Sequence, residues 1–492
     1  MYFLAIDQST SATKALLFDR NGVSVDRESL EHRQYHPHPG WVEHDAEEIW
    51  QNMLEVLRKL LSRQARKRRQ IASLSITNQR ETVVVFDRAS GRPLAPAMVW
   101  QCRRGDPFCA AHRHSGAESL VHRKTGLRLD AYFSGSKLQW LVWDNLDLRR
   151  KLADGSALIG TMDAYLIYRL TDGKVFATDH TNASRTLLFD IHALQWNDTL
   201  CALWDVPRHA LPEVRESSDQ FGKTTIDGML SQPLPIRGVM GDSQASLFAQ
   251  RCFIPGSAKI TFGTGSSVLL NIGSVARTLD NGILTALAWV HRGVPTYAFE
   301  GIIISSASTL TWLRDKLGMP DVPELEQLAL SVADSAGVHL IPAFNGLGLP
   351  HWRPDVRAAI TGLTPASDRR HIARAAFESI AFQMRDVLDS LRRAAGLSSG
   401  ALHADGGPTA SSFLMQLTAD LGSTELRVSN MRDCSPLGAV LAGQLGLGLH
   451  GSIADLARMP HAETIYAPHA TAEQIAARHN AWSRALHSVL AS

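Results

Sequence analysis

The sequence lacks several features that would place it in a specialised class. Its 492 residues include only five cysteines, and no two of them form a C-x-x-C pair. Neither a zinc ribbon nor a dithiol redox motif is therefore available, and the wide, odd-numbered spacing is typical of free thiols in a reducing compartment. The start MYFLAID lacks the basic region of a signal peptide, and no apolar run is long enough to span a membrane. We expect a cytoplasmic protein with no membrane partner.

An excess of one charge is also missing. Lys and Arg together number 50 and Asp and Glu 48, so the formal net charge is +2. This balance does not favour a nucleic-acid partner, and the basic run RQARKRR is better explained as a solvated helix end. Hydrophobic residues make up 45% of the chain, which is enough for a sizeable core. These values predict a soluble globular protein.

What the chain does contain is an alternation of strand-like runs with helical segments. Apolar runs at 2–6, 14–18 and 23–30 are separated by small polar turns, which predicts three strands. Residues 45–61 have apolar side chains at helical spacing, with Asp45 as the expected N-cap. Intermixed strands and helices indicate the α/β class.

A second strand–turn–strand unit at 259–271 has the same plan as the opening unit. It indicates a duplicated architecture and a domain boundary near residue 250. Further on, 371–395, 410–421 and 472–490 show helical periodicity, and Gly396 is the expected C-cap of the first of these helices. We therefore predict two domains, 1–251 and 252–492.

Three turns rich in small residues are candidates for phosphate binding: DQSTSATK (7–14), FGTGSS (262–267) and DGGPTAS (405–411). Turns of Gly, Ser and Thr expose backbone N–H groups and hydroxyls that suit phosphate oxygens. None of them matches the P-loop pattern or a Rossmann G-x-G-x-x-G. Each alone is better explained as a surface hairpin, so a nucleotide site requires all three to meet in one cleft, which we predict that they do.

Charged residues also stand at unusual places. NQRE puts Arg80 and Glu81 between two strand-like runs, and GDSQAS puts Asp242 at a strand-to-helix junction. An acid at such a junction is either an N-cap or a functional carboxylate, such as a general base. Asp7, at the end of the first strand, has the same two interpretations.

These motifs carry a family resemblance. IDQSTSATKALLFD, ITNQRET, TNASRT, FGTGSS, PAFNGLGLPHW and DGGPTASSFLMQ occur in an order that resembles the FGGY family of carbohydrate kinases, and within it the glycerol kinases. The resemblance runs from residue 3 to about residue 450. It implies an actin-like (ribonuclease H-like) fold of two domains, each built on a five-stranded sheet, with a cleft between them. Domain 1–251 would bind the acceptor and supply the catalytic Asp, and domain 252–492 would bind the nucleotide.

The resemblance also implies a reaction and its participants. ATP with Mg²⁺ would phosphorylate a small polyol or sugar, with Asp242 as the base that accepts the hydroxyl proton and Asp7 organising Mg²⁺ through water. The side chains implied at the acceptor are Arg80, Glu81, Trp100, Tyr132, Asp242, Ser243 and Ser267. Those implied at the nucleotide are Thr10, Ser11, Thr13, Lys14, Gly263, Thr264, Ala307, Thr311, Gly407 and Ser411. A homo-oligomer, dimer or tetramer, is expected.

Several positions depart from the glycerol kinase pattern. Ser243 and Ser267 stand where those kinases have a Gln and a Phe, which predicts a roomier, more polar acceptor pocket. A larger polyol such as erythritol or a pentitol, or a ketose, is then an alternative acceptor, unless neighbouring side chains fill the space. On the nucleotide side the departures are Ser9, Ala307, Thr311 and Ser411, in place of Gly, Gly, Gln and Asn.

Other interpretations stay open from the sequence. A non-catalytic sugar or nucleotide sensor, or an actin-like ATPase, would share the scaffold, although Asp242 with the Arg80–Glu81 pair favours catalysis on a hydroxylated acceptor. Trp100 has an alternative role in core packing. The histidines of HPHPGWVEH have no common zinc spacing.

Overall fold

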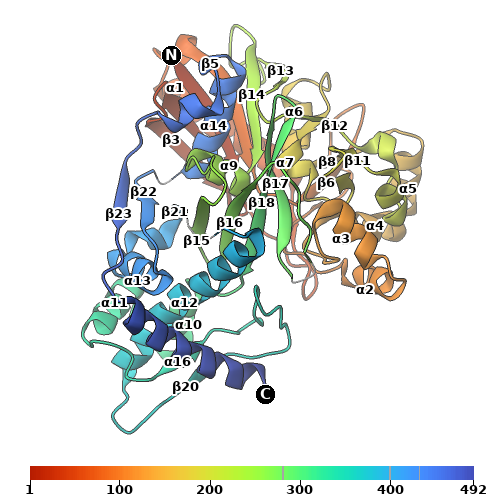
Figure 1. The fold of residues 1–492 in the computed structure, drawn as a ribbon. Coiled ribbons are helices and arrows are strands. Elements are labelled where there is room, and N and C mark those ends of the chain that lie inside the picture. The colour runs from red at the N-terminus through yellow and green to blue at the C-terminus, as the bar shows by residue number, and fades with distance from the viewer. Residues whose placement is uncertain (280–281, 398–399, 432, 492) are drawn as a thin grey trace.

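The computed structural model describes residues 1–279, 282–397, 400–431 and 433–491. Two large mixed sheets with surrounding helices form its framework, and the chain runs from the first sheet to the second (Figure 1). The architecture confirms the predicted α/β class with two sheet-centred halves.

The first sheet has the strand order β13-β14-β5-β1-β2-β3. β1 is antiparallel to β2 and parallel to β5, and β14 continues parallel to β5 on the far side. The run from Phe3 to Ile6 has no exposed surface, which explains why an uninterrupted apolar segment is a central strand here. The strands are β1 (Tyr2–Gln8), β2 (Ala12–Asp19), β3 (Ser24–Glu31), β5 (Ile71–Asn78), β13 (Gln220–Thr224) and β14 (Leu234–Gly241).

The second sheet repeats this plan in the order β17-β18-β16-β15-β21-β22-β23. β15 is antiparallel to β16 and parallel to β21, as β1 is to β2 and β5. Each sheet thus contains the five strands implied by the resemblance, and β13, β17 and β23 extend the edges. The strands are β15 (Ala258–Phe262), β16 (Ser266–Gly273), β17 (Leu284–His291), β18 (Val294–Ile303), β21 (Leu402–Asp405), β22 (Leu426–Ser429) and β23 (Glu463–Tyr466).

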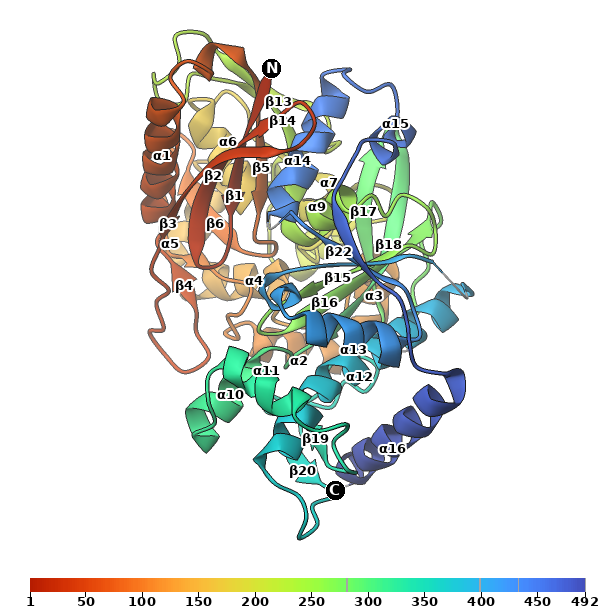
Figure 2. The ribbon, with the colours of Figure 1, turned by 90° about the vertical axis from the view of Figure 1, so that its left-hand side faces the viewer.

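The predicted helices are present with their caps. Asp45 accepts N–H groups from the first turn of α1 (Ala46–Arg63), and Gly396 follows α12 (Arg369–Ala395) at a φ of 67°, in the left-handed region that glycine favours. α13 (Ser412–Gly422) and α16 (Ala472–Leu490) match the remaining predictions. In the second view α1 lies on one side of the first sheet and α12, α13 and α16 gather below the second (Figure 2).

One C-terminal helix packs against the first sheet. α14 (Cys434–Gly446) contacts β14, β5 and α9 (Asp242–Ala249). The approach is close enough to require glycine on both sides: a Cβ on Gly238 would lie 1.9 Å from the Ala439 carbonyl oxygen, and one on Gly438 would lie 1.8 Å from that of Ala245. The C-terminal part of the chain therefore covers a face of the N-terminal sheet.

The remaining elements form smaller layers around the two sheets. β4 (Glu43–His44), β7 (Ala97–Met98), β6 (Val83–Asp87) and β8 (Ala157–Thr161) make a four-stranded sheet, and three strand pairs complete the set: β9 (Ala177–Asp179) with β12 (Glu213–Arg215), β10 (Phe189–Asp190) with β11 (Gln195–Trp196), and β19 (His339–Ile341) with β20 (Ala359–Thr361).

The other α-helices lie between and outside these sheets. The segment GTMDAYLIYRL contains α6, and among the described residues no helix is both long and apolar enough to cross a membrane. The helices are α2 (Asp106–His114), α3 (Glu118–Thr125), α4 (Ser134–Asp144), α5 (Leu146–Ala153), α6 (Met162–Leu170), α7 (His180–Ala183), α8 (Asp198–Leu203), α10 (Ser308–Leu317), α11 (Val322–Leu330) and α15 (Ile453–Ala457).

Candidate active site

The parallel strands of the first sheet bring the candidate acceptor residues together. β1, β5 and β14 are neighbours, and their registers pair Asp7 with Thr77 and Asn78 with Gly241. Asp7, the Arg80–Glu81 turn and Asp242 therefore emerge at the same edge of the sheet, where open α/β sheets bind their ligands. Positions separated by more than 230 residues become one site because the carboxyl ends of parallel strands coincide.

Asp242 is the first residue of α9, and Gly241 occupies the N-cap position. Among the described residues its carboxylate accepts only the adjacent Ser243 N–H, at 2.6 Å, so it is not the capping group of the helix. The side chain is 40% exposed although protein surrounds it, which places it in a recess. Burial raises the pKa of Asp242, and the nearby Arg80 guanidinium offsets only part of that effect.

Arg80 connects this carboxylate to the wall of the recess. Its NH2 donates to Glu300 Oε1 at 3.1 Å and its NH1 to Gln244 Oε1 at 3.2 Å. Its Nε lies 3.1 Å from Asp242 Oδ1, yet has no partner in hydrogen-bonding geometry among the described residues. Arg80 thus neutralises Asp242 by proximity while leaving the carboxylate oxygens available.

Glu81 sits in a strained turn that its neighbours hold in place. Its φ is 63°, unusual for a residue with a side chain, and its backbone carbonyl accepts the Ser134 hydroxyl at 2.9 Å. Arg185, which follows α7, donates from Nε to Glu81 Oε1 at 2.5 Å. The same guanidinium lies 6.0 Å from the Tyr132 ring. These contacts bring the Arg80–Glu81 pair and Tyr132 to one wall, as the sequence led us to expect.

Glu300 and Arg185 complete a buried ion cluster. Arg185 NH1 donates to Glu300 Oε2, and both side chains are at most 1% exposed. Burial opposes ionisation of Glu300, but Arg185 and Arg80 together outweigh it and hold its pKa at about 2. Burial also raises the pKa of Glu81, and the two arginines offset only part of this increase. The cluster holds one permanent cation, Arg80, beside Asp242.

Trp100 joins the acceptor wall to the first small-residue turn. Its indole N–H donates to Thr10 Oγ1 at 3.0 Å, and its ring centroid lies 5.3 Å from that of Tyr132. Ser267, on β16, donates to Glu300 Oε1 at 3.3 Å. Both are half-buried, and Trp100 also packs against the small hydrophobic cluster of Val42, Val99 and Cys102.

The second and third small-residue turns lie side by side. β15 and β21 are parallel, with Thr261 opposite Asp405, so the turns that follow them leave the sheet together. Gly406 has a φ of 101°, and a Cβ there would lie 1.9 Å from the Phe262 carbonyl oxygen. The first turn is connected to the other two through α9. At the start of this helix, Asp242 is close enough to Asp7 for the Asp7 charge to raise its pKa. One helical turn further, the Ser246 hydroxyl donates to Asp405 in the third turn.

Most of the nucleotide-side candidates gather at these turns. Ala307 N–H donates to the Gly263 carbonyl at 3.0 Å, and Thr311 stands one turn further along α10. Thr264 is exposed beside them and Gly407 opens the third turn, whereas the Ser411 hydroxyl caps α13 by accepting the Leu414 N–H. In the first turn Ser11 is exposed, but the Thr13 side chain has no exposed surface.

The described residues contain no group of three or more His, Cys, Asp or Glu side chains that could hold a metal ion, so a divalent cation here would take most of its ligands from water or phosphate. Asp7 is 6% exposed, pairs with Lys14 Nζ at 2.7 Å through one oxygen, and raises the pKa of Asp242 across the recess. Asp405 Oδ1 is buried without a hydrogen-bond partner in the described part of the chain. Carboxylate oxygens are the ligands that Mg²⁺ prefers, and a cation would relieve the repulsion between these acids.

Two residues of the ion cluster, Arg185 and Glu300, were not predicted from the sequence. Both had a signal: Arg185 lies within the TNASRT motif, and Glu300 is a lone acid in the apolar strand TYAFEGII. A charge inside a buried strand is rare unless it is paired, so this position could have been singled out.

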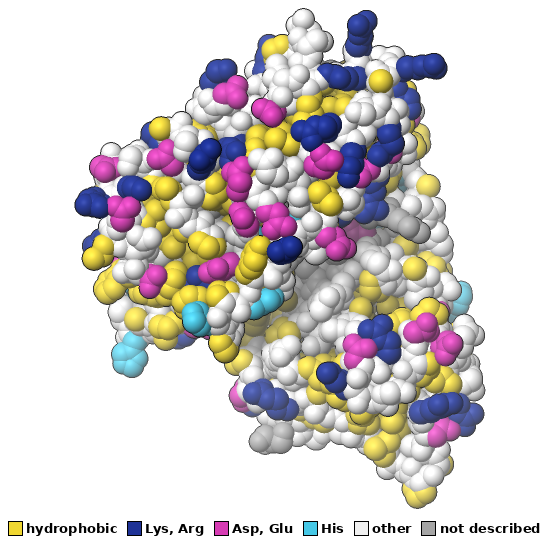
Figure 3. All heavy atoms as spheres, turned by 180° about the vertical axis from the view of Figure 1, so that it is seen from behind, with side chains coloured by type: hydrophobic (Ala, Val, Ile, Leu, Met, Phe, Trp, Pro, Cys, Tyr) yellow, Lys and Arg dark blue, Asp and Glu magenta, His cyan; other side chains and the backbone are white. Residues whose placement is uncertain are grey.

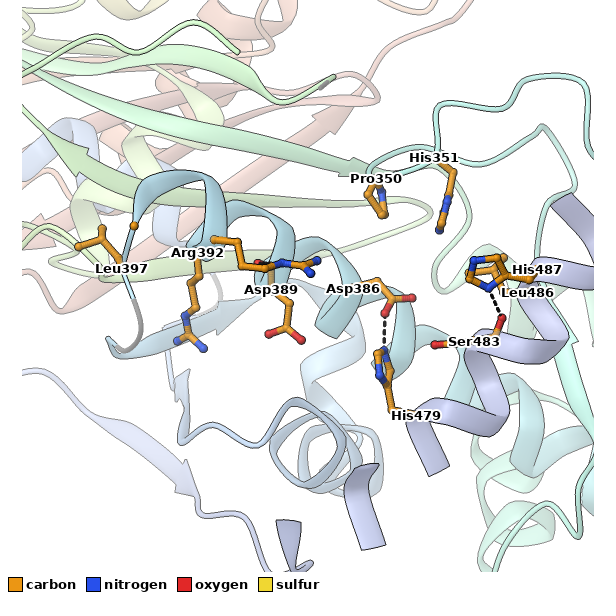
Figure 4. A pocket seen from close by; sticks show the side chains of 12 residues that line it. Pro350, His351, Asp386, Asp389, Arg392, Leu397, His479, Ser483, Leu486 and His487 are labelled. Carbon is orange, nitrogen blue, oxygen red and sulfur yellow. Dashed lines mark hydrogen bonds and ion pairs between the residues drawn. The ribbon is translucent and has the colours of Figure 1, made fainter. Parts of the chain in front are cut away.

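A separate cavity lies elsewhere, between α12, α16 and the loop at Pro350 and His351. Its volume is about 710 Å³, and Figure 4 shows its side chains, with His479 bonded to Asp386. Its two arginines are balanced by two aspartates, and it contains none of the predicted site residues, so we do not place the reaction there.

Seen from behind, the surface of the whole molecule is hollowed between its upper and lower parts (Figure 3).

Known proteins resemble this chain over its whole length. Glycerol kinase 1 of Thermotoga maritima is 42% identical over 492 residues, covering all of both chains, and glycerol kinase 2 of Pseudomonas aeruginosa is 43% identical, covering 99% of this chain and 96% of its own. The crystal structure of Plasmodium falciparum glycerol kinase with ADP superposes with a TM-score of 0.94 at 32% identity, covering 99% of this chain and 98% of that one. A Lactobacillus acidophilus xylulose kinase, 20% identical with a TM-score of 0.88 over 100% and 99% of the two chains, shares the fold.

Family models cover both halves of the chain. The N-terminal domain of the FGGY family of carbohydrate kinases matches residues 2–249, and its C-terminal domain matches residues 258–447. The chain belongs to the FGGY family of carbohydrate kinases.

Proposed function

We propose that this protein is an ATP-dependent kinase that transfers the γ-phosphoryl group to a hydroxyl of glycerol or a closely similar polyol. The observation that carries the proposal is the recessed Asp242 carboxylate beside a buried wall of Arg80, Glu81 and Tyr132. The printed names of the full-length relatives support glycerol as the acceptor, and the ADP of the Plasmodium enzyme supports an adenine nucleotide.

Asp242 is placed to act as the general base. A carboxylate that is ionised, partly desolvated and reachable can accept the proton of a hydroxyl as the oxygen attacks phosphorus. Arg80 favours the ionised form of Asp242, and its Nε–H, which has no hydrogen-bond partner among the described residues, would donate to an acceptor oxygen, whereas Glu81 would accept from acceptor hydroxyls. Tyr132 and Trp100 offer ring faces and edges to the C–H groups of a polyol. These residues select a small hydroxylated molecule and orient it.

The three turns form the nucleotide side of the proposed site. Thr10 and Ser11, with Gly263 and Thr264, offer backbone and hydroxyl donors to phosphate oxygens, and Gly407 leaves room for the nucleoside. Asp7 would hold Mg²⁺ through water, and that ion supplies charge neutralisation to the phosphates. Lys14 limits the net charge near Asp7. The Thr13 hydroxyl is not assigned to the phosphates, because this side chain is fully buried.

A larger acceptor is the second candidate, and Ser267 favours it. The Ser267 side chain is half-buried on the acceptor wall, where its hydroxyl donates to Glu300. It is much smaller than the Phe ring that glycerol kinases have at this position. Its hydroxyl could reach a further substrate oxygen directly or through water. Erythritol or a pentitol would use the extra space, whereas glycerol would leave it to solvent.

An acceptor panel tests both candidates. We expect ADP release from ATP and Mg²⁺ to require a polyol, and kcat/KM to be highest for glycerol or for a C4 or C5 polyol. ADP release that is independent of any acceptor would instead indicate an actin-like ATPase, and ligand binding without turnover would indicate a sensor. A homo-oligomer and a cytoplasmic location stay predictions, to be checked by light scattering of the eluted protein and by cell fractionation.

A further inference from the structure

Glu300 belongs to the second sheet but binds arginines from the first half of the chain. It lies on β18, where it pairs in register with Leu269 of β16. Its two oxygens receive Arg80 NH2 and Arg185 NH1, from positions 220 and 115 residues earlier in the chain. The side chain is 1% exposed and both of its oxygens already accept arginine N–H groups, so we do not assign it a direct contact with an acceptor. Its influence on the site has to pass through the groups that it holds.

Of the two arginines that Glu300 binds, Arg80 is the one next to Asp242. Glu300 and Gln244 occupy the two terminal nitrogens of this guanidinium, at 3.1 and 3.2 Å. Only Nε is directed toward Asp242, and it stays out of hydrogen-bonding geometry. A guanidinium with free terminal nitrogens prefers a two-pronged bond to a carboxylate. Glu300 thus prevents Arg80 from closing such a bond onto the base.

We propose that Glu300 is a positioning residue of the acceptor site, which holds Arg80 away from a two-pronged bond with Asp242 and keeps both groups available to the acceptor. This inference rests on the proposed function. It also explains why a carboxylate with no exposed role lies within an apolar strand: a neutral residue there would leave two buried guanidinium groups without their shared counter-charge.

The direct test is Glu300→Gln, which keeps the side-chain size and one acceptor oxygen but removes the charge. We expect the acceptor KM to rise at least tenfold and kcat to fall, while the KM for ATP changes less than threefold. The Kd for glycerol, measured by calorimetry without nucleotide, should rise in parallel with the KM. That measurement does not depend on turnover.

Glu378 provides a matched control elsewhere in the chain. It is a buried glutamate, 3% exposed, that also receives two arginines and a serine: Arg374 at 2.8 Å, Arg478 at 2.6 Å and Ser335 at 3.2 Å. Glu378→Gln therefore reports the cost of neutralising such a cluster away from the site. We expect it to lower Tm about as much as Glu300→Gln does, with the acceptor KM and Kd within twofold of wild type.

Glu300→Asp keeps the inference testable if the Gln variant does not fold. It retains the charge but withdraws the carboxylate from Arg80, so we expect a raised acceptor KM with Tm close to wild type. Glycerol Kd and acceptor KM within twofold of wild type in the folded Glu300 variants, or an equal rise in the Glu378 variant, would overturn the inference. If the wild type does not phosphorylate any polyol, the proposed function is refuted. The role of Glu300 is judged separately, from the comparison of glycerol Kd between the variants and the wild type.

Discussion

Replacing Asp242 with Asn should nearly abolish turnover without destabilising the fold. The carboxylate does not cap α9, and in the described part of the chain it accepts one hydrogen bond, from the neighbouring Ser243 N–H. Because burial raises its pKa above the ordinary value, the folded chain holds the ionised form less well than the unfolded chain does. A neutral amide of the same shape removes that cost, so Tm should stay the same or rise.

The expected loss of rate follows from the chemistry that the amide cannot perform. Asn cannot accept the hydroxyl proton, and loss of a general base typically lowers kcat by about 10²–10⁴-fold. This corresponds to about 3–5 kcal/mol of transition-state stabilisation. Arg80 keeps its bonds to Glu300 and Gln244, so the acceptor wall should persist and the acceptor Kd should change less than about threefold.

The assay compares kcat, acceptor Kd and Tm with those of a matched variant. Asp198 is likewise the first residue of a helix, α8, but it is exposed and lies outside the proposed site. Asp198→Asn should leave all three quantities unchanged. Retention of more than a tenth of the wild-type kcat by Asp242→Asn would refute the assignment of the base.

Three further changes probe other parts of the site. Ser267→Phe should lower the ratio of kcat/KM for a pentitol to that for glycerol about tenfold, because a ring fills the space beside Glu300, and an unchanged ratio would mean that neighbours already fill it. Trp100→Phe removes the N–H bond to Thr10 and should raise the KM for both ATP and the polyol, whereas an effect on the polyol alone would argue against the link between the two sides. His44 is fully buried, and burial lowers its pKa to about 3. Below pH 6.5 this histidine is therefore protonated in the unfolded chain but stays neutral in the folded chain. The free energy of unfolding should therefore fall by about 2 kcal/mol between neutral pH and about pH 5, and His44→Gln should flatten that acid limb in urea titrations.

Much of the fold could be predicted because its signals are local. The apolar runs at the start of the chain became β1, β2 and β3, and Asp45 and Gly396 ended up at the helix termini where their backbone preferences place them. The repeated strand–turn–strand unit indicated duplication correctly. The position of α14 was not foreseen, since its packing on the first sheet depends on contacts such as Gly238 with Ala439, which no local pattern encodes.

The acceptor wall could be predicted only in part, for a physical reason. Motifs marked the residues at turns and strand ends, where polar side chains stand out, but ion pairs between distant strands leave no periodic signal. Arg185 and Glu300 are meaningful only as partners, and their separation in sequence hides the partnership.

The buried cluster also ties acceptor recognition to the second sheet. The cluster combines Arg80 and Arg185 with the carboxylates of Glu81, Glu300 and Asp242, and the buried Lys259 also acts on Asp242 and Glu300. Of these three acids, Asp242 is the one that solvent can reach. Buried ion pairs rarely add stability over apolar packing, so their presence is better explained by the arrangement that they impose. Here the arrangement keeps the accessible carboxylate of Asp242 at the recess, where a hydroxyl can bind. A site assembled in this way needs both halves of the chain before any acceptor arrives.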